Sequence, residues 1–201
     1  MIKNYIFDFG KVLVEFDPNY MTAAYVKDPV QAAQIAQVVF DRLYWDPLDY
    51  GGISDEELKN ACHARLPKQL HALADEVYDR WLENLPFIDG MPQLVQDIKA
   101  AGGKVFLLSN ISIGFAEHWH HVPQLHQLLS LFDGLVFSGP LGIVKPSREI
   151  FQYVMRTFGL KEEECIFIDD SEKNILGAEK AGIRGYLFDG DPAKLRTALG
   201  F

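Results

Sequence analysis

"YIFDFGKVLVEFD", residues 5–17, runs three apolar residues straight into a carboxylate at Asp8 and places a glycine, Gly10, two residues later. The apolar run predicts a buried strand. A carboxylate next to such a strand is costly to bury unless a cation or hydrogen-bond donors compensate it. Asp8 therefore either lies beyond the strand in solvent or faces a site that holds such groups, and the rest of the chain has to distinguish the two.

The second half of the chain alternates between predicted helices and predicted strands. Helical patterns bounded by N-cap residues or glycines cover 90–103, 147–159, 172–182 and 191–200. Short apolar runs typical of strands cover 104–109, 134–138, 165–169 and 185–188. Such alternation is typical of βαβ units, which build a parallel sheet with helices on both faces. We expect an α/β fold with a Rossmann-like sheet, to which the strand at 5–7 also belongs.

A stretch near the N-terminus does not follow this alternation. Residues 15–88 lack short β-branched runs and are rich in Ala, Gln, Leu and Glu. We predict helices at 29–44, 54–66 and 72–85, the second with a capping box formed by Ser54 and Glu57. The chain is therefore expected to consist of an α/β core, residues 1–14 and 89–201, interrupted by a helical insert, residues 15–88.

Composition and charge restrict the classes of partner. The chain has 201 residues, 48% of them hydrophobic, and a formal net charge of −9, which argues against a general binder of nucleic acid or of anionic membranes. Its two cysteines, Cys62 and Cys165, form no metal-binding pattern, so we expect a reduced, cytoplasmic setting without a secretory leader. The longest uncharged apolar stretch, 105–116, is too short and too polar for a membrane span.

Polar residues collect where the predicted strands end, which is where open parallel sheets bind ligands. Each of them alone is an ordinary turn, cap or surface residue. Together they supply carboxylates that would repel one another without a cation such as Mg²⁺, and donors suited to a phosphoryl group. The residues are Asp8, Ser109, Asn110, Lys145, Asp169 and Asp170.

The order of these residues resembles the haloacid dehalogenase superfamily. Its motifs appear here as "IFDFGKV" at 6–12, "FLLSN" at 106–110, "VKPSREIF" at 144–151 and "IFIDDSEKN" at 166–174. The helical insert is similar to the small, mobile helical cap that the superfamily carries between its first two motifs. "FDFGKVLVEFD" and "GIVKPSREIFQ" look closest to the sugar-phosphate phosphatase branch, including the glucose-1-phosphatase type.

The resemblance implies roles for individual residues. Asp8 matches the nucleophile that becomes an aspartyl-phosphate, and Lys145 matches the lysine that offsets charge on this aspartate and on the phosphate. Ser109, with its neighbour Asn110, matches the phosphate-binding motif.

The metal site implied by the resemblance consists of Asp8, the Gly10 carbonyl and Asp170, with Mg²⁺ as the cofactor. Whether Asp169 or Asn174 also serves the metal is left open. The implied function is a Mg²⁺-dependent phosphatase acting on a small phosphate monoester, with a sugar phosphate as the expected substrate. The specific substrate and the oligomeric state do not follow from the sequence.

Gly10 departs from the family pattern, because the superfamily has its general acid/base aspartate at this position. Glycine keeps a carbonyl for the metal but has no group that can transfer a proton, a loss that typically costs roughly 10²–10⁴-fold in rate. Taken by itself, this change predicts a rate that depends steeply on the leaving group. The alternative function is a non-catalytic or weakly catalytic phosphate-ligand module, and a mutase or dehalogenase within the superfamily also stays open. A dinucleotide-binding domain is excluded, because "DFGKVL" is not a GxGxxG turn.

Overall fold

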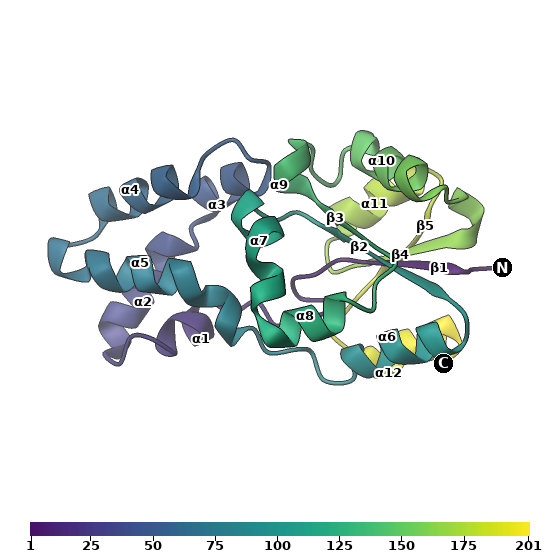
Figure 1. The fold of residues 1–201 in the computed structure, drawn as a ribbon, viewed down its shortest axis with the longest axis horizontal. Helices are drawn as coiled ribbons and strands as arrows, with labels where there is room; N and C mark the ends of the chain where they lie inside the picture. The colour runs from purple at the N-terminus through teal and green to yellow at the C-terminus, as the bar shows by residue number, and fades with distance from the viewer.

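A single parallel sheet forms the centre of the protein in the computed structural model, which describes residues 1–201 (Figure 1). Its five strands have the order β3-β2-β1-β4-β5, so the first strand of the sequence lies in the middle. This confirms the expected α/β class. The strands are β1 (Asn4–Phe7), β2 (Lys104–Ser109), β3 (Gly134–Phe137), β4 (Cys165–Asp169) and β5 (Arg184–Leu187).

Helices cover both faces of the sheet, as expected. Successive side chains of a strand point to opposite faces, so Phe7 joins one hydrophobic cluster and Ile6 joins the other. On the Phe7 face lie α6 (Met91–Ala100) and α12 (Pro192–Leu199), and on the Ile6 face lie α10 (Arg148–Phe158) and α11 (Glu172–Lys180) (Figure 1). Burial on both faces explains why the strands read as nearly continuous apolar runs.

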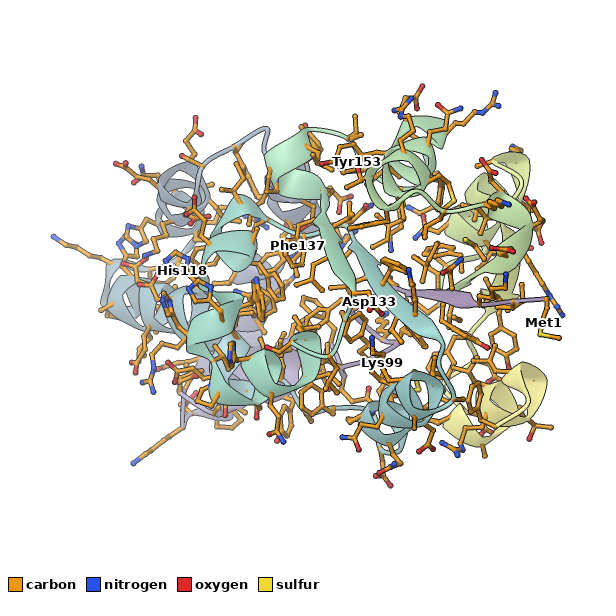
Figure 2. All side chains as sticks on the ribbon, turned by 45° about the vertical axis from the view of Figure 1, so that its right-hand side comes forward. Met1, Lys99, His118, Asp133, Phe137 and Tyr153 are labelled. Carbon is orange, nitrogen blue, oxygen red and sulfur yellow. The ribbon has the colours of Figure 1, made fainter.

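An ion pair joins one of these helices to the sheet. The Nζ atom of Lys99 in α6 lies 2.7 Å from a carboxylate oxygen of Asp133, which immediately precedes β3 (Figure 2). The same carboxylate accepts a hydrogen bond from the backbone N–H of Val105 in β2. Asp133 therefore connects the helix, the second strand and the start of the third.

The helices of residues 15–88 lie beyond the carboxyl ends of the strands (Figure 1). The predicted capping box is present, because Ser54 Oγ accepts from the N–H of Glu57 and the Glu57 carboxylate accepts from the N–H of Ser54. The helices are α1 (Pro18–Ala23), α2 (Pro29–Val39), α3 (Arg42–Asp49), α4 (Asp55–Arg65) and α5 (His71–Arg80), with 3-10 turns η1 (Lys68–Leu70) and η2 (Trp81–Asn84).

Two helix predictions in this region differ from the structure. The helix expected over 29–44 is broken at Asp41, which has an extended backbone and whose carboxylate accepts a hydrogen bond from the N–H of Leu43. This side chain caps a new helix instead of continuing the old one. The helix expected over 72–85 changes to a 3-10 turn at Trp81.

The segments that enter and leave this helical region pair with each other. Val14 and Phe87 form an antiparallel bridge. On either side of it the N–H of Glu15 donates to the Pro86 carbonyl at 2.8 Å, and the N–H of Ile88 donates to the Leu13 carbonyl at 3.0 Å. The two connections are thus held side by side close to the end of β1.

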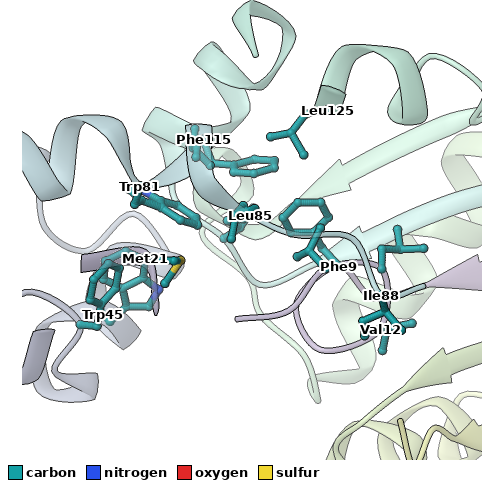
Figure 3. Packing of buried hydrophobic residues seen from close by; sticks show 14 of the residues in the cluster. Phe9, Val12, Met21, Trp45, Trp81, Leu85, Ile88, Phe115 and Leu125 are labelled. Carbon is teal, nitrogen blue, oxygen red and sulfur yellow. The ribbon is translucent and has the colours of Figure 1, made fainter. Parts of the chain in front are cut away.

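Aromatic side chains continue the hydrophobic cluster from the sheet into the helical region (Figure 3). The ring of Phe9 lies 5.0 Å from that of Phe115, and the Phe115 ring lies 6.3 Å from the indole of Trp81. Trp81 in turn contacts Trp45 at 5.4 Å. Trp81 itself is buried.

Several short helices had no counterpart in the sequence analysis. The unpredicted elements outside the insert are α7 (Ile113–His118), η3 (Trp119–His121), α8 (Pro123–Leu129), α9 (Ser138–Leu141) and η4 (Glu162–Glu164).

None of the helices in the structure has the length and apolar character needed to cross a bilayer.

Candidate active site

The carboxyl ends of the two central strands bring three aspartates together. Asp8 follows β1 directly, and its N–H donates to the Ile168 carbonyl of β4 at 2.9 Å. Asp169 is the last residue of β4, and Asp170 follows it. One oxygen atom from each of the three carboxylates lies within 4.8 Å of the others. Of the two alternatives for Asp8, the structure shows a carboxylate that faces other charged groups instead of open solvent.

Lys145 lies between two of these carboxylates. Its Nζ atom is 2.7 Å from Asp8 Oδ1 and 2.7 Å from Asp169 Oδ2, and its side chain is only 1% exposed. Burial pushes the pKa of Lys145 down, but the charges of Asp8 and Asp169 outweigh this effect and hold the pKa above its ordinary value. The ammonium group therefore stays charged and fixes the direction of Asp8.

Asn110 holds the backbone of Lys145 in place. Its side-chain Oδ1 accepts from the N–H of Lys145 at 2.8 Å, and its Nδ2 donates to the Lys145 carbonyl at 3.0 Å. Both polar atoms of the amide are used in this way, so the side chain acts as a support for the lysine. Ser109, the residue before it, is buried at the end of β2, the strand next to β1.

Asp169 is the fixed member of the acidic pair. Its Oδ1 accepts from the N–H of Ser171 and from Asn174 Nδ2, and its Oδ2 accepts from Lys145 and from the same amide nitrogen. The side chain is fully buried. Asp169 therefore serves as a counter-charge for Lys145. The Oδ1 atom of Asn174 is buried at the same place without any hydrogen-bond partner.

The remaining carboxylate oxygens suit a divalent cation. Burial raises the pKa of Asp8, with a further increase from the charge of Asp169, and the same two causes raise the pKa of Asp170. A hard cation would reverse both shifts, because it stabilises the ionised carboxylates. Asp8 Oδ2 has no hydrogen bond to the protein, and Asp170 is exposed. With the partnerless Asn174 oxygen nearby, the donor set fits Mg²⁺ or its bound water.

Nothing in the local structure requires a glycine at position 10. Its φ angle lies outside the left-handed region. A Cβ atom built there would meet only Phe16 Cβ, at 3.9 Å, which is ordinary van der Waals contact. The one non-glycine residue with a left-handed backbone is its neighbour Lys11, with a φ angle of 58°. A side chain can therefore begin at position 10 without a clash at its Cβ atom, so the backbone does not demand a glycine there.

A family model described as haloacid dehalogenase-like hydrolase matches residues 2–182. The chain belongs to this family. It is therefore a hydrolase, as the motifs indicated. Its relatives include a sesquiterpene phosphatase of Aspergillus oryzae, 25% identical over 90% of this chain and 86% of the relative. Another is the D-ribitol-5-phosphate phosphatase of Bacteroides thetaiotaomicron, 26% identical over 92% of this chain and 91% of the relative.

Solved structures of the family share the fold. A haloacid dehalogenase family enzyme from Bacteroides thetaiotaomicron, in complex with magnesium and inorganic phosphate, superposes with a TM-score of 0.72 at 21% identity and covers 97% of this chain and 99% of its own. The L-2-haloacid dehalogenase of Xanthobacter autotrophicus gives a TM-score of 0.67 at 20% identity, with 92% and 76% covered. Together they support the Rossmann-like assignment.

Proposed function

We propose that this hydrolase is a Mg²⁺-dependent phosphatase that cleaves a small phosphate monoester through an aspartyl-phosphate on Asp8. The observation that carries the proposal is the ion pair of Asp8 with Lys145, which is itself fixed by the buried Asp169. One oxygen of Asp8, Oδ1, is held by Lys145 and by the N–H of Phe9, which fixes the direction of the carboxylate. The phosphatases among the relatives support the same reaction class.

The chemistry divides into two displacements at phosphorus. In the first, an electron pair of the Asp8 carboxylate forms a bond to phosphorus while the bond to the substrate oxygen breaks. In the second, water attacks phosphorus and releases Asp8 as a carboxylate. Lys145 holds the orientation of Asp8 and offsets negative charge beside it throughout. Ser109 and the backbone of Asn110, at the end of the neighbouring strand, are the proposed contacts for the phosphoryl oxygens.

Asp8, the Gly10 carbonyl and Asp170 are the proposed holders of Mg²⁺. When bound, the ion supplies positive charge that keeps the carboxylates ionised and offsets the charge of the phosphoryl group. Asp169 is not included, since its two oxygens already accept hydrogen bonds from Lys145, Ser171 and Asn174.

Residues 15–88 are the proposed cap, because their helices lie over the strand ends that carry Asp8 (Figure 1). Such a cover excludes water from the reacting groups and selects the substrate by the alcohol part of the ester. A sugar phosphate is the proposed substrate class, which the relative acting on D-ribitol 5-phosphate supports. A screen of sugar phosphates, prenyl phosphates and nucleotides with Mg²⁺ tests this choice.

Replacement of the nucleophile tests the reaction itself. Asp8→Asn keeps the shape of the side chain but removes the attacking charge, so turnover of the best ester should fall on the order of 10³-fold or more. Asp189→Asn is the matched control, because Asp189 also follows a strand but is exposed and pairs with Lys194. Its activity should equal that of the parent. A folded Asp8→Asn protein with parental activity would contradict the proposed nucleophile.

Metal binding gives a second test that does not depend on turnover. Calorimetric titration should show that Asp170→Asn weakens binding of Mg²⁺, whereas Asp189→Asn leaves it unchanged. Chelation with EDTA should stop hydrolysis, and added Mg²⁺ should restore it. If the chain binds Mg²⁺ and phosphate but no ester is hydrolysed, the non-catalytic binding module is the better description.

A further inference from the structure

A buried carboxyl group of the insert lies close to the reaction site without any structural partner. Asp49 is the last residue of α3 and is 5% exposed. Its Oδ1 atom is buried and has no hydrogen bond in the structure. Buried polar groups without a partner are rare in folded proteins and call for a specific explanation.

The charged groups around Asp49 belong either to its own helix or to the site. Arg42 and Asp46 of α3 pair with each other at 2.6 Å on the surface. The charges that act on Asp49 from outside the helix are those of Asp8 and Lys145. No hydrogen bond or ion pair joins its carboxyl to these two residues. Burial raises the pKa of Asp49 to about 8. Burial therefore favours the protonated form of this carboxyl group.

The backbone of Asp49 is fastened to the end of the second strand. The Oγ atom of Ser138 donates to the Asp49 carbonyl and accepts from the N–H of Ile111, two residues beyond Ser109. Ser138 is fully buried. This double hydrogen bond sets the end of α3 at a fixed place above the strand ends.

Two glycines make this close approach possible. Gly51 has a φ angle of +71°, and a Cβ atom there would lie 2.6 Å from the Gly139 carbonyl oxygen. A Cβ atom on Gly139 would in turn lie 2.8 Å from the carbonyl oxygen of Ile111. The end of α3, the start of α9 and the residues after β2 are therefore packed backbone against backbone.

We propose that Asp49 is the general acid and base of the reaction and takes the place of the aspartate missing at position 10. In the first displacement the Asp49 proton goes to the substrate oxygen as its bond to phosphorus breaks, so the alcohol leaves neutral. In the second, the Asp49 carboxylate takes a proton from water as that water forms its bond to phosphorus and Asp8 is released. The inference rests on the proposed phosphatase reaction.

The leaving group provides the test. We would compare kcat/KM of the parent and Asp49→Asn over phosphate esters from p-nitrophenyl to simple alkyl. The parent should show a shallow dependence on leaving-group pKa, because Asp49 supplies the proton. The variant should lose about 10²–10⁴-fold on alkyl esters and much less on the aryl ester, whose oxygen needs no proton. The steep dependence expected from Gly10 alone should therefore appear only in the variant.

A pH profile and a rescue separate catalysis from structure. For alkyl esters the parent kcat/KM should fall as pH rises past the pKa of Asp49, and this decline should be absent in Asp49→Asn. Gly10→Asp added to Asp49→Asn should restore alkyl turnover, since a Cβ atom at position 10 meets no close contact. Asp46→Asn, on the same helix but exposed, is the control and should keep the parental leaving-group dependence.

The other possible outcomes distinguish the role of Asp49 from the proposed phosphatase reaction. An equal loss on all esters, or no loss, would overturn the role of Asp49 while leaving the phosphatase reaction standing. A steep dependence already present in the parent would do the same. A parent that hydrolyses no phosphate ester would overturn the proposed function, and this inference with it.

Discussion

Lys145 shows how a buried lysine can be favourable at this site. The carboxylates of Asp8 and Asp169 each lie 2.7 Å from its ammonium group, so the buried positive charge is compensated on two sides. Removing the lysine would leave Asp8 and Asp169 as uncompensated buried charges, a change that typically costs about 3–5 kcal/mol. The lysine therefore maintains the fold in addition to its proposed role in the reaction, so its substitution cannot isolate the chemistry.

Asp49 should make the stability of the protein depend on pH. Its pKa is raised by burial to about 8 in the folded state, so the folded state holds a proton that the unfolded state releases above its ordinary pKa of 3.8. This contribution to stability is fully present below pH 3.8 and is lost as pH rises through about 8. Asp49→Asn, which cannot ionise, should therefore lose less stability than the parent between pH 5 and pH 9.

Urea denaturation of the metal-free proteins at the two pH values measures this difference. Asp46→Asn serves again as the control, because Asp46 is exposed and its removal should shift stability little at either pH. A parent and an Asp49→Asn variant that lose stability in parallel between pH 5 and pH 9 would show that Asp49 does not carry the buried proton.

The sequence pointed to some residues of the candidate site and not to others, for a physical reason. Asp8 and Asp170 directly follow strands, and Lys145 shortly precedes a helix. Parallel strands bring such positions to one edge of the sheet. The division of labour between Asp169 and Asp170 required the hydrogen bonds of the folded state. No pattern in the sequence pointed to Asp49, because its position depends on how helix α3 docks on the core.

The docking of α3 on the core involves two hydrogen bonds of Ser138. Ser138→Ala would leave the buried N–H of Ile111 and the carbonyl of Asp49 without their partner, so the free energy of unfolding should fall by about 1–3 kcal/mol. Because the hydroxyl also positions Asp49, turnover of alkyl phosphates should fall more than that of aryl phosphates. Denaturation curves and the two kcat/KM values measure these effects.

Ser54→Ala is a matched control for this prediction. It removes the cap of α4 and should cost about 1 kcal/mol of stability, but Ser54 is exposed and has its hydrogen bonds with Glu57. The ratio of alkyl to aryl turnover should stay at the parental value. If both serine variants change that ratio equally, general loosening of the insert explains the effect and a positioning role for Ser138 is wrong.

Helix prediction was sound where one pattern dominated and failed where side chains competed with it. The capping box of α4 and the apolar faces of α6 and α10 are local signals, and these helices were found. At Asp41 the helical pattern continues, yet the side chain bonds to Leu43 and starts a new helix. The short helix α7 depends on a cap at Ser112 and on burial of Phe115, which only the folded core supplies.

The hydrophobic core joins the whole molecule. A cluster of 41 buried residues runs from one face of the sheet into the helices of residues 15–88, whereas a second cluster of 13 lies on the opposite face. Phe9 and Phe115 lie where the larger cluster passes from the sheet to the insert (Figure 3). Movement of the insert during turnover, which stays a prediction, would have to preserve or replace these contacts.

We therefore expect the insert and the core to unfold together. The three tryptophans, Trp45, Trp81 and Trp119, report on the insert and on η3, while far-UV circular dichroism reports on all helices and on the sheet. Because one cluster holds both parts, urea curves from the two signals should coincide. Phe115→Ala should shift both curves together, with a loss of about 3–5 kcal/mol. The exposed Tyr20, replaced by Ala, should shift neither. A fluorescence transition that precedes the dichroism transition in the parent would mean that the insert folds as a separate unit, with the aromatic contacts too weak to couple it to the sheet.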